Sequence, residues 1–450
     1  QGRPPRDPSA CRSSAAFSPR TRPASPLRPP RPRLRPKLQP PCRDQALRRP
    51  LLSAAVREVL RTTMSSSPTV IPGLHHRRPQ STALFALEPP WHSLEHAPQG
   101  DRAGVYQHRR QRGGPLAAAA RGAACHRSPS CPRGEPVWEL VFSTALNVLT
   151  SMLWGLSEDV DVSMKFRAVV RSRRGMGRRM KRLWDRYDVL WKKFVEESGR
   201  RGEEDEGKGG KAFLQVMVEV LERRDQKDPL TMDHVKALFL ELILGGTDTT
   251  STTIEWAMAE LMRNPDIMRK IQDELDAVVG KERAVEESDV PKLEYLRAVT
   301  KETLRLHPVV PLLVPRSPSS PCTVGGYTIP KGSKVFVNVW MIQRDAAIWG
   351  EDAVEFRPER FLTAADDKYE FRGTNFAYLP FGSGRRMCAG ISLAEKMVTH
   401  MLASFLHSFR WKLPEGEKLE LGERFGLVMR KAEPLVLVPT ARFDDPDLYS

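Results

Sequence analysis

Cysteine is scarce in this sequence, and its spacing fits neither a metal cluster nor a disulfide framework. The 450 residues contain six cysteines. No two of them lie about two to four residues apart, as paired zinc ligands do, and small disulfide-rich domains are much denser in cysteine. We therefore expect neither kind of site and infer that the main domain faces a reducing compartment. The cysteines are Cys11, Cys42, Cys125, Cys131, Cys322 and Cys388.

Long apolar runs are also missing. No stretch of about 18 or more uninterrupted apolar residues exists, so the sequence predicts no obvious membrane span. Residues 140–155 come nearest, but Ser143, Asn147 and Ser151 interrupt them and Glu139 precedes them. This pattern favours a buried or amphipathic helix over a membrane anchor.

Acidic residues and lysine are nearly missing from residues 1–135. This segment holds 24 Lys and Arg against 7 Asp and Glu, with Lys37 as its one lysine, whereas the other 315 residues hold 47 against 48. The formal charge of +16 therefore comes from this segment, which also contains 22 of the 38 prolines. Such a composition buries too little apolar surface to offset chain entropy, so we expect disorder there. The remainder has no charge pattern that indicates a nucleic-acid partner.

Three interpretations of residues 1–135 remain open. An Arg-rich, acid-poor opening is typical of an organelle transit peptide, although this one is unusually long. It could bind RNA, but lysine and aromatic residues are sparse. It could also come from a wrong gene boundary or reading frame, which is the interpretation we favour. The sequence thus divides into residues 1–135 and a domain at 136–450, without internal repeats.

One cysteine lies in an unusual setting near the C-terminus. Residues 381–390 read FGSGRRMCAG, and an apolar helical stretch follows. A thiolate at Cys388 could be an axial iron ligand, since Gly384 and Gly390 allow the backbone close to a flat macrocycle and Arg386 offers donors to a carboxylate. The alternative is a buried structural cysteine before a helix.

The spacing of this loop resembles the haem-binding loop of cytochrome P450 enzymes. The resemblance implies that Cys388 binds the iron of haem b, and that the loop residues around it hold the cofactor. These residues are Phe381, Gly384, Arg386 and Gly390.

A long helix with a polar interruption is predicted upstream. Thr231 can cap it, and an apolar stripe follows before residues 245–250, which read GGTDTT. Two glycines and three threonines are poor helix formers, so we expect a local kink or widening there. The segment resembles the oxygen-binding notch of cytochrome P450 enzymes, which implies that Gly246 makes room for dioxygen and that Asp248 and Thr249 relay protons. The alternative is a capped helix end, although apolar periodicity continues beyond it.

A third motif suggests an ion-pair network. Glu302 and Arg305 lie three residues apart on a helix that Pro308 ends. By the same resemblance they form a buried network that Arg360, from a later loop, completes. Such a network is structural, and breaking one partner costs about 3–5 kcal/mol.

Short β-prone runs lie between these motifs. Residues 323–329 and 333–339 predict a small sheet. Just before them, Arg316 is available to a haem propionate by the resemblance, or it is a plain solvated arginine. Residues 338–345 further resemble the plant microsomal branch of the family.

The resemblance covers about residues 136–440 and implies a mainly α fold with small β-sheets. The implied reaction inserts one oxygen atom from O2 into a small apolar substrate, such as a plant secondary metabolite, with electrons from an NADPH-dependent cytochrome P450 reductase. A cysteinate ligand favours O–O cleavage. The resemblance also implies that the protein is located at the cytosolic face of the endoplasmic reticulum membrane, although we recognise no membrane anchor in the sequence.

Two alternatives remain at this point. We recognise no counterparts of the family's N-terminal parts in residues 1–135, so these parts are expected to be missing or replaced. The chain could then be a haem-binding pseudoenzyme. It could also be a thiolate-haem isomerase or dehydratase that needs no reductase, although the two site motifs lack the alterations typical of that group.

Overall fold

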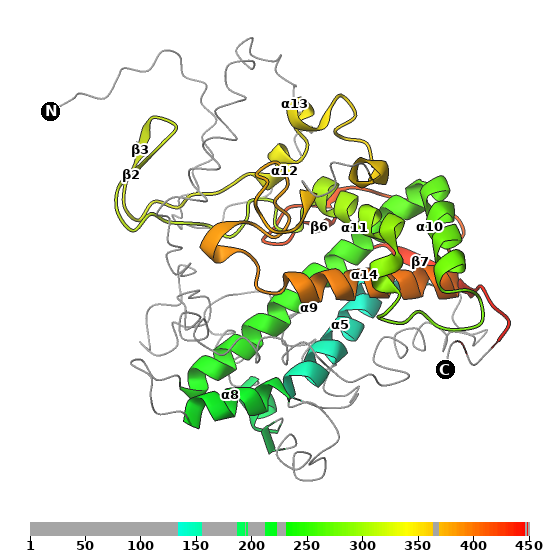
Figure 1. Ribbon diagram of the computed structural model, residues 1–450, viewed down its shortest axis with the longest axis horizontal. Helices are drawn as coiled ribbons and strands as arrows, with labels where there is room; N and C mark the ends of the chain where they lie inside the picture. The colour runs from blue at the N-terminus through cyan, green and yellow to red at the C-terminus, as the bar shows by residue number, and fades with distance from the viewer. Residues whose placement is uncertain are drawn as a thin grey trace, which may run out of the picture. The chain divides into compact units, whose positions relative to one another are not determined.

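The computed structural model describes residues 134–154, 187–193, 195–196, 212–222, 231–362, 369–445 and 448 (Figure 1). Apart from residues 134 and 135, the segment 1–135 lies outside the described residues. The described part is mainly helical with three small sheets, as the sequence predicts.

The longest element is helix α9, Met232–Arg263. Thr231 caps the N-terminus of this helix, as predicted, because its hydroxyl accepts a hydrogen bond from the backbone N–H of His234. The ring of His234 in turn accepts a hydrogen bond from the N–H of Thr231, which completes a reciprocal cap. The predicted apolar stripe is buried and includes Val235, Phe239 and Ile243.

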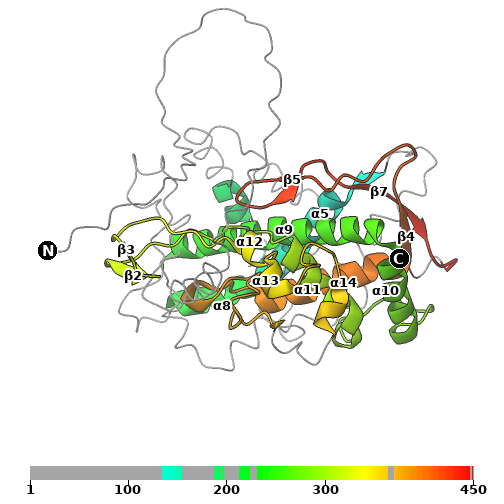
Figure 2. The same ribbon diagram turned by 90° about the horizontal axis from the view of Figure 1, so that it is seen from above.

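Helix α5, Val137–Trp154, runs along α9 (Figures 1 and 2). Among the described helices it alone is long and apolar enough to cross a membrane, judged by length and composition, and 61% of that window is buried inside the structure. Trp154 of α5 packs edge-on against Phe239 of α9, with ring centroids 5.0 Å apart. The expectation of a buried helix at residues 140–155 is therefore confirmed.

The other helices pack on α9 or close to it. Apolar side chains form one buried cluster around the C-terminal half of α9 and a second around its N-terminal half. The longer helices are α8 (Phe213–Glu222), α10 (Pro265–Val278), α11 (Glu294–Leu306) and α14 (Ile391–Ser408), and the short ones are α12 (Val339–Ile342), α13 (Ala346–Trp349), η3 (Val290–Lys292), η4 (Pro358–Phe361) and η6 (Gly384–Arg386). Helices α12, α13 and η4 contribute to two further buried clusters.

The strands are short and antiparallel. One sheet has the order β1–β7–β4, and β2–β3 and β5–β6 are separate hairpins. Gly325 and Gly326, both with positive φ, form the β2–β3 turn. The strands are β1 (Glu135–Pro136), β2 (Cys322–Val324), β3 (Tyr327–Ile329), β4 (Phe409–Lys412), β5 (Glu423–Arg424), β6 (Arg430–Lys431) and β7 (Val436–Ala441).

The strand predicted at residues 333–339 is largely wrong. The structure has only an isolated bridge there, between Val335 and Arg316. The run ends early because the side chain of Asn338 accepts a hydrogen bond from the N–H of Met341 and caps α12. A polar N-cap thus competes with the β propensity of the preceding valines.

The expected local widening of α9 at residues 245–250 is not found, and the expected kink there stays a prediction. The helix is α-helical throughout, and the hydroxyls of Thr247, Thr249 and Ser251 donate to carbonyl groups one turn earlier. These bonds satisfy the hydroxyls within the helix.

Replacing Gly245 by alanine should raise the free energy of unfolding by about 0.5–1 kcal/mol, because an alanine loses less backbone entropy in a helix. Gly245 is exposed, and an added Cβ there meets nothing within 4 Å. Gly246→Ala is the matched variant: its Cβ would lie 2.8 Å from Cδ1 of Leu149, so its gain should be smaller or reversed. Urea unfolding of both variants measures the difference, and equal gains would contradict the packing described here.

Candidate active site

The loop at residues 381–390 folds back on itself before α14. The carbonyl of Phe381 accepts a hydrogen bond from the N–H of Cys388, with 3.0 Å between N and O. Gly382 and Gly384 both have φ of +74°, a conformation that a residue with a side chain rarely adopts. Gly390 is the N-cap residue of α14. The local sequence therefore places Cys388 at the end of a tight turn and at the start of a buried helix.

The Cys388 thiol remains accessible at the surface of this turn. Surrounding protein atoms nevertheless partly desolvate the sulfur, and this raises the pKa of the thiol, while a hydrogen bond from the backbone N–H of Gly390 acts in the opposite direction. A donor aimed at sulfur is an arrangement that stabilises a ligating thiolate. The structure thus provides one accessible sulfur ligand with a backbone donor beside it.

Two arginines are close to Cys388, Arg386 within the loop and Arg316 beside it. Arg316 is buried, and its Nη2 donates to the carbonyl of Ser383 at 2.8 Å. Burial lowers the pKa of Arg316, and the nearby charge of Arg386 lowers it further. Arg386 also acts on Glu241 of α9, whose pKa burial raises to about 7 while Arg386 opposes the increase. Arg316 is therefore not a plain solvated arginine.

The three polar or small residues predicted on α9 face different neighbours. Thr249 is partly exposed, and its hydroxyl donates to the carbonyl of Gly245 at 2.5 Å. The carboxylate of Asp248 is buried and forms an ion pair with Arg430 of β6. Gly246 packs against Leu149 of α5, so that Gly245 is the exposed glycine of the pair. The role expected of Gly246 stays a prediction, and its neighbour in the structure is an apolar helix.

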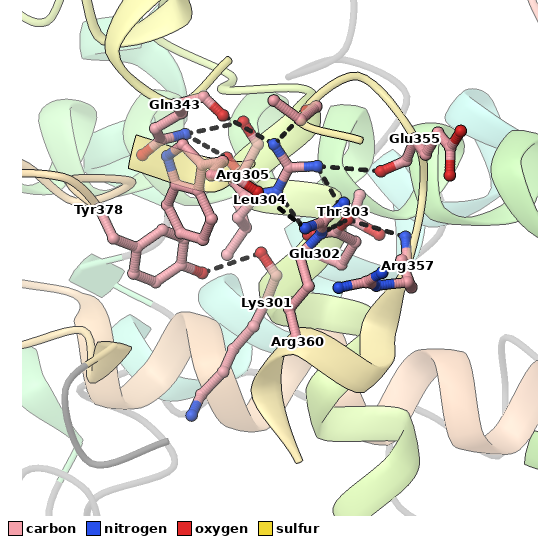
Figure 3. Close-up of polar contacts among 12 residues, drawn as sticks. Lys301, Glu302, Thr303, Leu304, Arg305, Gln343, Glu355, Arg357, Arg360 and Tyr378 are labelled. Carbon is pink, nitrogen blue, oxygen red and sulfur yellow. Dashed lines mark hydrogen bonds and ion pairs between the residues drawn. The ribbon is translucent and has the colours of Figure 1, made fainter. Parts of the chain in front are cut away.

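The structure brings the three residues of the predicted ion-pair network into contact (Figure 3). Arg305 binds Glu302 through two hydrogen bonds, Nε to Oε2 at 2.6 Å and Nη2 to Oε1 at 2.8 Å, and both side chains are 0% exposed. Arg360 donates from Nε to Oε1 of Glu302 at 3.3 Å. Two guanidinium groups thus share one buried carboxylate.

The network also binds backbone groups from the segment after α12. Arg305 donates to the carbonyls of Gln343, Ala353 and Glu355 at 2.7, 2.6 and 3.0 Å. Arg360 has a second carboxylate partner, Asp352, at 2.9 Å. The carbonyl partners leave no side-chain signal in the sequence, and no motif pairs Asp352 with Arg360.

Gln343 links this network to the chain that leads to the cysteine. Its side-chain amide donates to the carbonyls of Leu304 and Arg305 at 2.9 Å and accepts a hydrogen bond from the N–H of Leu379 at 2.9 Å. The hydroxyl of Tyr378 donates to the carbonyl of Lys301 (Figure 3). Buried hydrogen bonds therefore fix the segment immediately before the Cys388 loop to α11.

The residues present fit a haem with thiolate ligation. The donor set has an accessible sulfur with a backbone N–H beside it, and two neighbouring guanidinium groups suit a ligand that carries two carboxylates. Cys388 would hold the iron, and Arg316 and Arg386 would bind the propionates. Phe381 packs edge-on against Phe371, which braces the base of the loop.

Comparisons with known proteins agree on one family. The family model "Cytochrome P450" matches residues 142–438. The chain is 45% identical over 284 residues to a flavonoid 3',5'-hydroxylase of Crocosmia x crocosmiiflora, which covers 61% of this chain and 52% of that protein. It is 47% identical over 229 residues to geraniol 8-hydroxylase of Catharanthus roseus, and this match covers 50% of this chain and 46% of that protein.

A solved structure shares the fold. A zebra fish cytochrome P450 with abiraterone superposes with a TM-score of 0.67 at 25% sequence identity, and the match covers 87% of this chain and 92% of that one. The chain spans about half the length of the curated relatives it matches.

Proposed function

Because the chain belongs to the cytochrome P450 family, we propose that it is a haem-thiolate monooxygenase acting on a small apolar substrate. The fold predicted from the sequence and its plant branch are confirmed by the family model and the plant relatives. The observation that carries the proposed reaction is the exposed Cys388 in a loop whose preceding segment is fixed to α11 by buried hydrogen bonds.

The overall reaction consumes the substrate RH, O2, NADPH and a proton, and yields ROH, water and NADP⁺. Haem b, when bound, supplies the oxygen activation that a cysteinate ligand favours. Cys388 holds the iron, and Arg316 and Arg386 orient the cofactor through its carboxylates. Gly384 and Gly390 would let the backbone of the Cys388 loop lie close to the haem, and Gly246 would make room for dioxygen. Asp248 and Thr249 are the proposed catalytic residues that would move protons to the dioxygen.

Electrons come from an NADPH-dependent cytochrome P450 reductase in this proposal, and the protein acts at the cytosolic face of the endoplasmic reticulum. The plant relatives support the hydroxylation reaction, because they are named as a flavonoid hydroxylase and a geraniol hydroxylase. The same names support a flavonoid or a terpenoid alcohol as the substrate.

A reconstitution experiment tests the proposal. The full chain is loaded with haem, mixed with plant reductase and NADPH, and supplied with geraniol or the flavanone naringenin under ¹⁸O2. We expect a hydroxylated product that carries one ¹⁸O atom and that needs both reductase and NADPH. Conversion of a fatty-acid hydroperoxide without reductase would favour the isomerase instead, and a haem-loaded chain that gives no product from any of these would favour the pseudoenzyme.

A further inference from the structure

The carboxylate of Asp248 already has a strong partner. Its side chain is 6% exposed, and Oδ1 accepts a hydrogen bond from Nη2 of Arg430 in an ion pair. Arg430 lies far away in the sequence, on the β5–β6 hairpin, and no motif pointed to it. Because an unpaired buried charge is costly, the ion pair with Arg430 stabilises the Asp248 carboxylate in this position.

Arg430 also contacts an aromatic side chain and faces a second arginine. Its guanidinium lies over the ring of Trp138 of α5, 4.6 Å from the ring centroid, and Trp138 stacks on Phe142. Directly opposite Arg430 in the β5–β6 ladder is Arg424. Like charges in facing positions of a ladder repel one another, and Asp248 supplies a compensating negative charge.

The hairpin that carries Arg430 is fastened to α9 close to this ion pair. The indole N–H of Trp256 donates to the carbonyl of Met429 at 3.2 Å, and Nζ of Lys431 lies 5.1 Å from the centroid of the same indole. Glu255 of α9 accepts a hydrogen bond from the N–H of Leu435 at 2.9 Å. The residues on both sides of Arg430 thus bind α9, so its guanidinium meets Asp248 in a fixed geometry.

We propose that Arg430 is a positioning residue for proton delivery, which holds the Asp248 carboxylate in the orientation from which it passes protons toward Thr249. Arg430 contacts Asp248 and acts through it. The inference rests on the proposed function, because the relay has a purpose only in a monooxygenase.

Arg430→Met should lower the yield of product per NADPH consumed about tenfold, as expected when a proton-transfer group is misplaced. Hydrogen peroxide should rise correspondingly, and the solvent deuterium isotope effect on product formation should increase. The reduced carbon monoxide spectrum should stay that of the wild type. Arg430→Lys keeps the charge without the planar fork, so we expect an intermediate yield. In Asp248→Asn, the further change Arg430→Met should have almost no effect on yield.

Arg424→Met is the matched control, because it removes the same charge from the facing position of the same hairpin. It should keep the wild-type yield. The proposal is overturned by an unchanged yield in Arg430→Met, by an equal loss in Arg424→Met, or by losses that add in the double variant.

A double-mutant cycle of melting temperatures, measured on the haem-free protein, separates this inference from the proposed function. The melting temperatures of Arg430→Met, Asp248→Asn and the double variant should be non-additive, because each change removes the same contact. A missing thiolate band in the wild type would defeat the proposed function, and additive melting temperatures would defeat the positioning role.

Discussion

Cys388→Ala is expected to abolish product formation and to remove the thiolate-type carbonyl band of the reduced protein. Cys388 is the proposed iron ligand, and alanine offers no donor atom in its place. The variant should still fold, because the thiol is accessible and the turn is held by backbone hydrogen bonds. Absorption spectra of the reduced protein with carbon monoxide, together with product assays, measure both effects.

Cys322→Ala is the control for this change. Cys322 is the other free cysteine of the described residues and lies in β2, away from the Cys388 loop in the sequence. Its replacement should leave the carbonyl band and the product yield at wild-type values. An equal loss in the two variants, or a wild-type band in Cys388→Ala, would contradict the assignment of the ligand.

Arg305→Met should lower the free energy of unfolding by about 3–5 kcal/mol, the usual cost of leaving a buried charge without its partner. Glu302 would lose both hydrogen bonds from Arg305 and keep only those from the backbone N–H of Arg357 and from Arg360, and three backbone carbonyls would lose a donor. Because the same network fixes the segment before Cys388, haem retention should fall as well. Urea unfolding followed by circular dichroism measures the stability change.

Arg297→Met is the matched control on the same helix. The side chain of Arg297 is 41% exposed and pairs with Glu370 and Glu395, and partly exposed pairs of this kind contribute at most about 1 kcal/mol. The double variant Glu302→Leu with Arg305→Met should recover part of the loss, since it removes the unpaired carboxylate. Equal effects of Arg297→Met and Arg305→Met would argue against a buried network.

The parts of the site that could be predicted depend on patterns within short stretches of sequence. The turn at Cys388, the cap at Thr231 and the helical spacing of Glu302 and Arg305 all involve residues within one or two turns of each other. The third member, Arg360, was found only because a family resemblance supplied the long-range pairing. Contacts between residues that are close together in the sequence can therefore be predicted from the sequence.

The parts that could not be predicted depend on partners far away in the sequence. Nothing near Asp248 indicates Arg430 as its counter-ion, and nothing near Gly246 indicates Leu149 as its neighbour. The hydrogen-bond partner of the buried Arg316 is likewise distant in the sequence, a carbonyl group in the Cys388 loop. Tertiary packing decides such contacts, and one sequence gives no signal for them.

The most direct test of the central claim is the absorption spectrum of the full chain after loading with haem, reduction and addition of carbon monoxide. Ligation by Cys388 predicts a strongly red-shifted, thiolate-type Soret band in the wild type. A band of the histidine type, or no carbonyl band from a haem-loaded protein, would contradict the account.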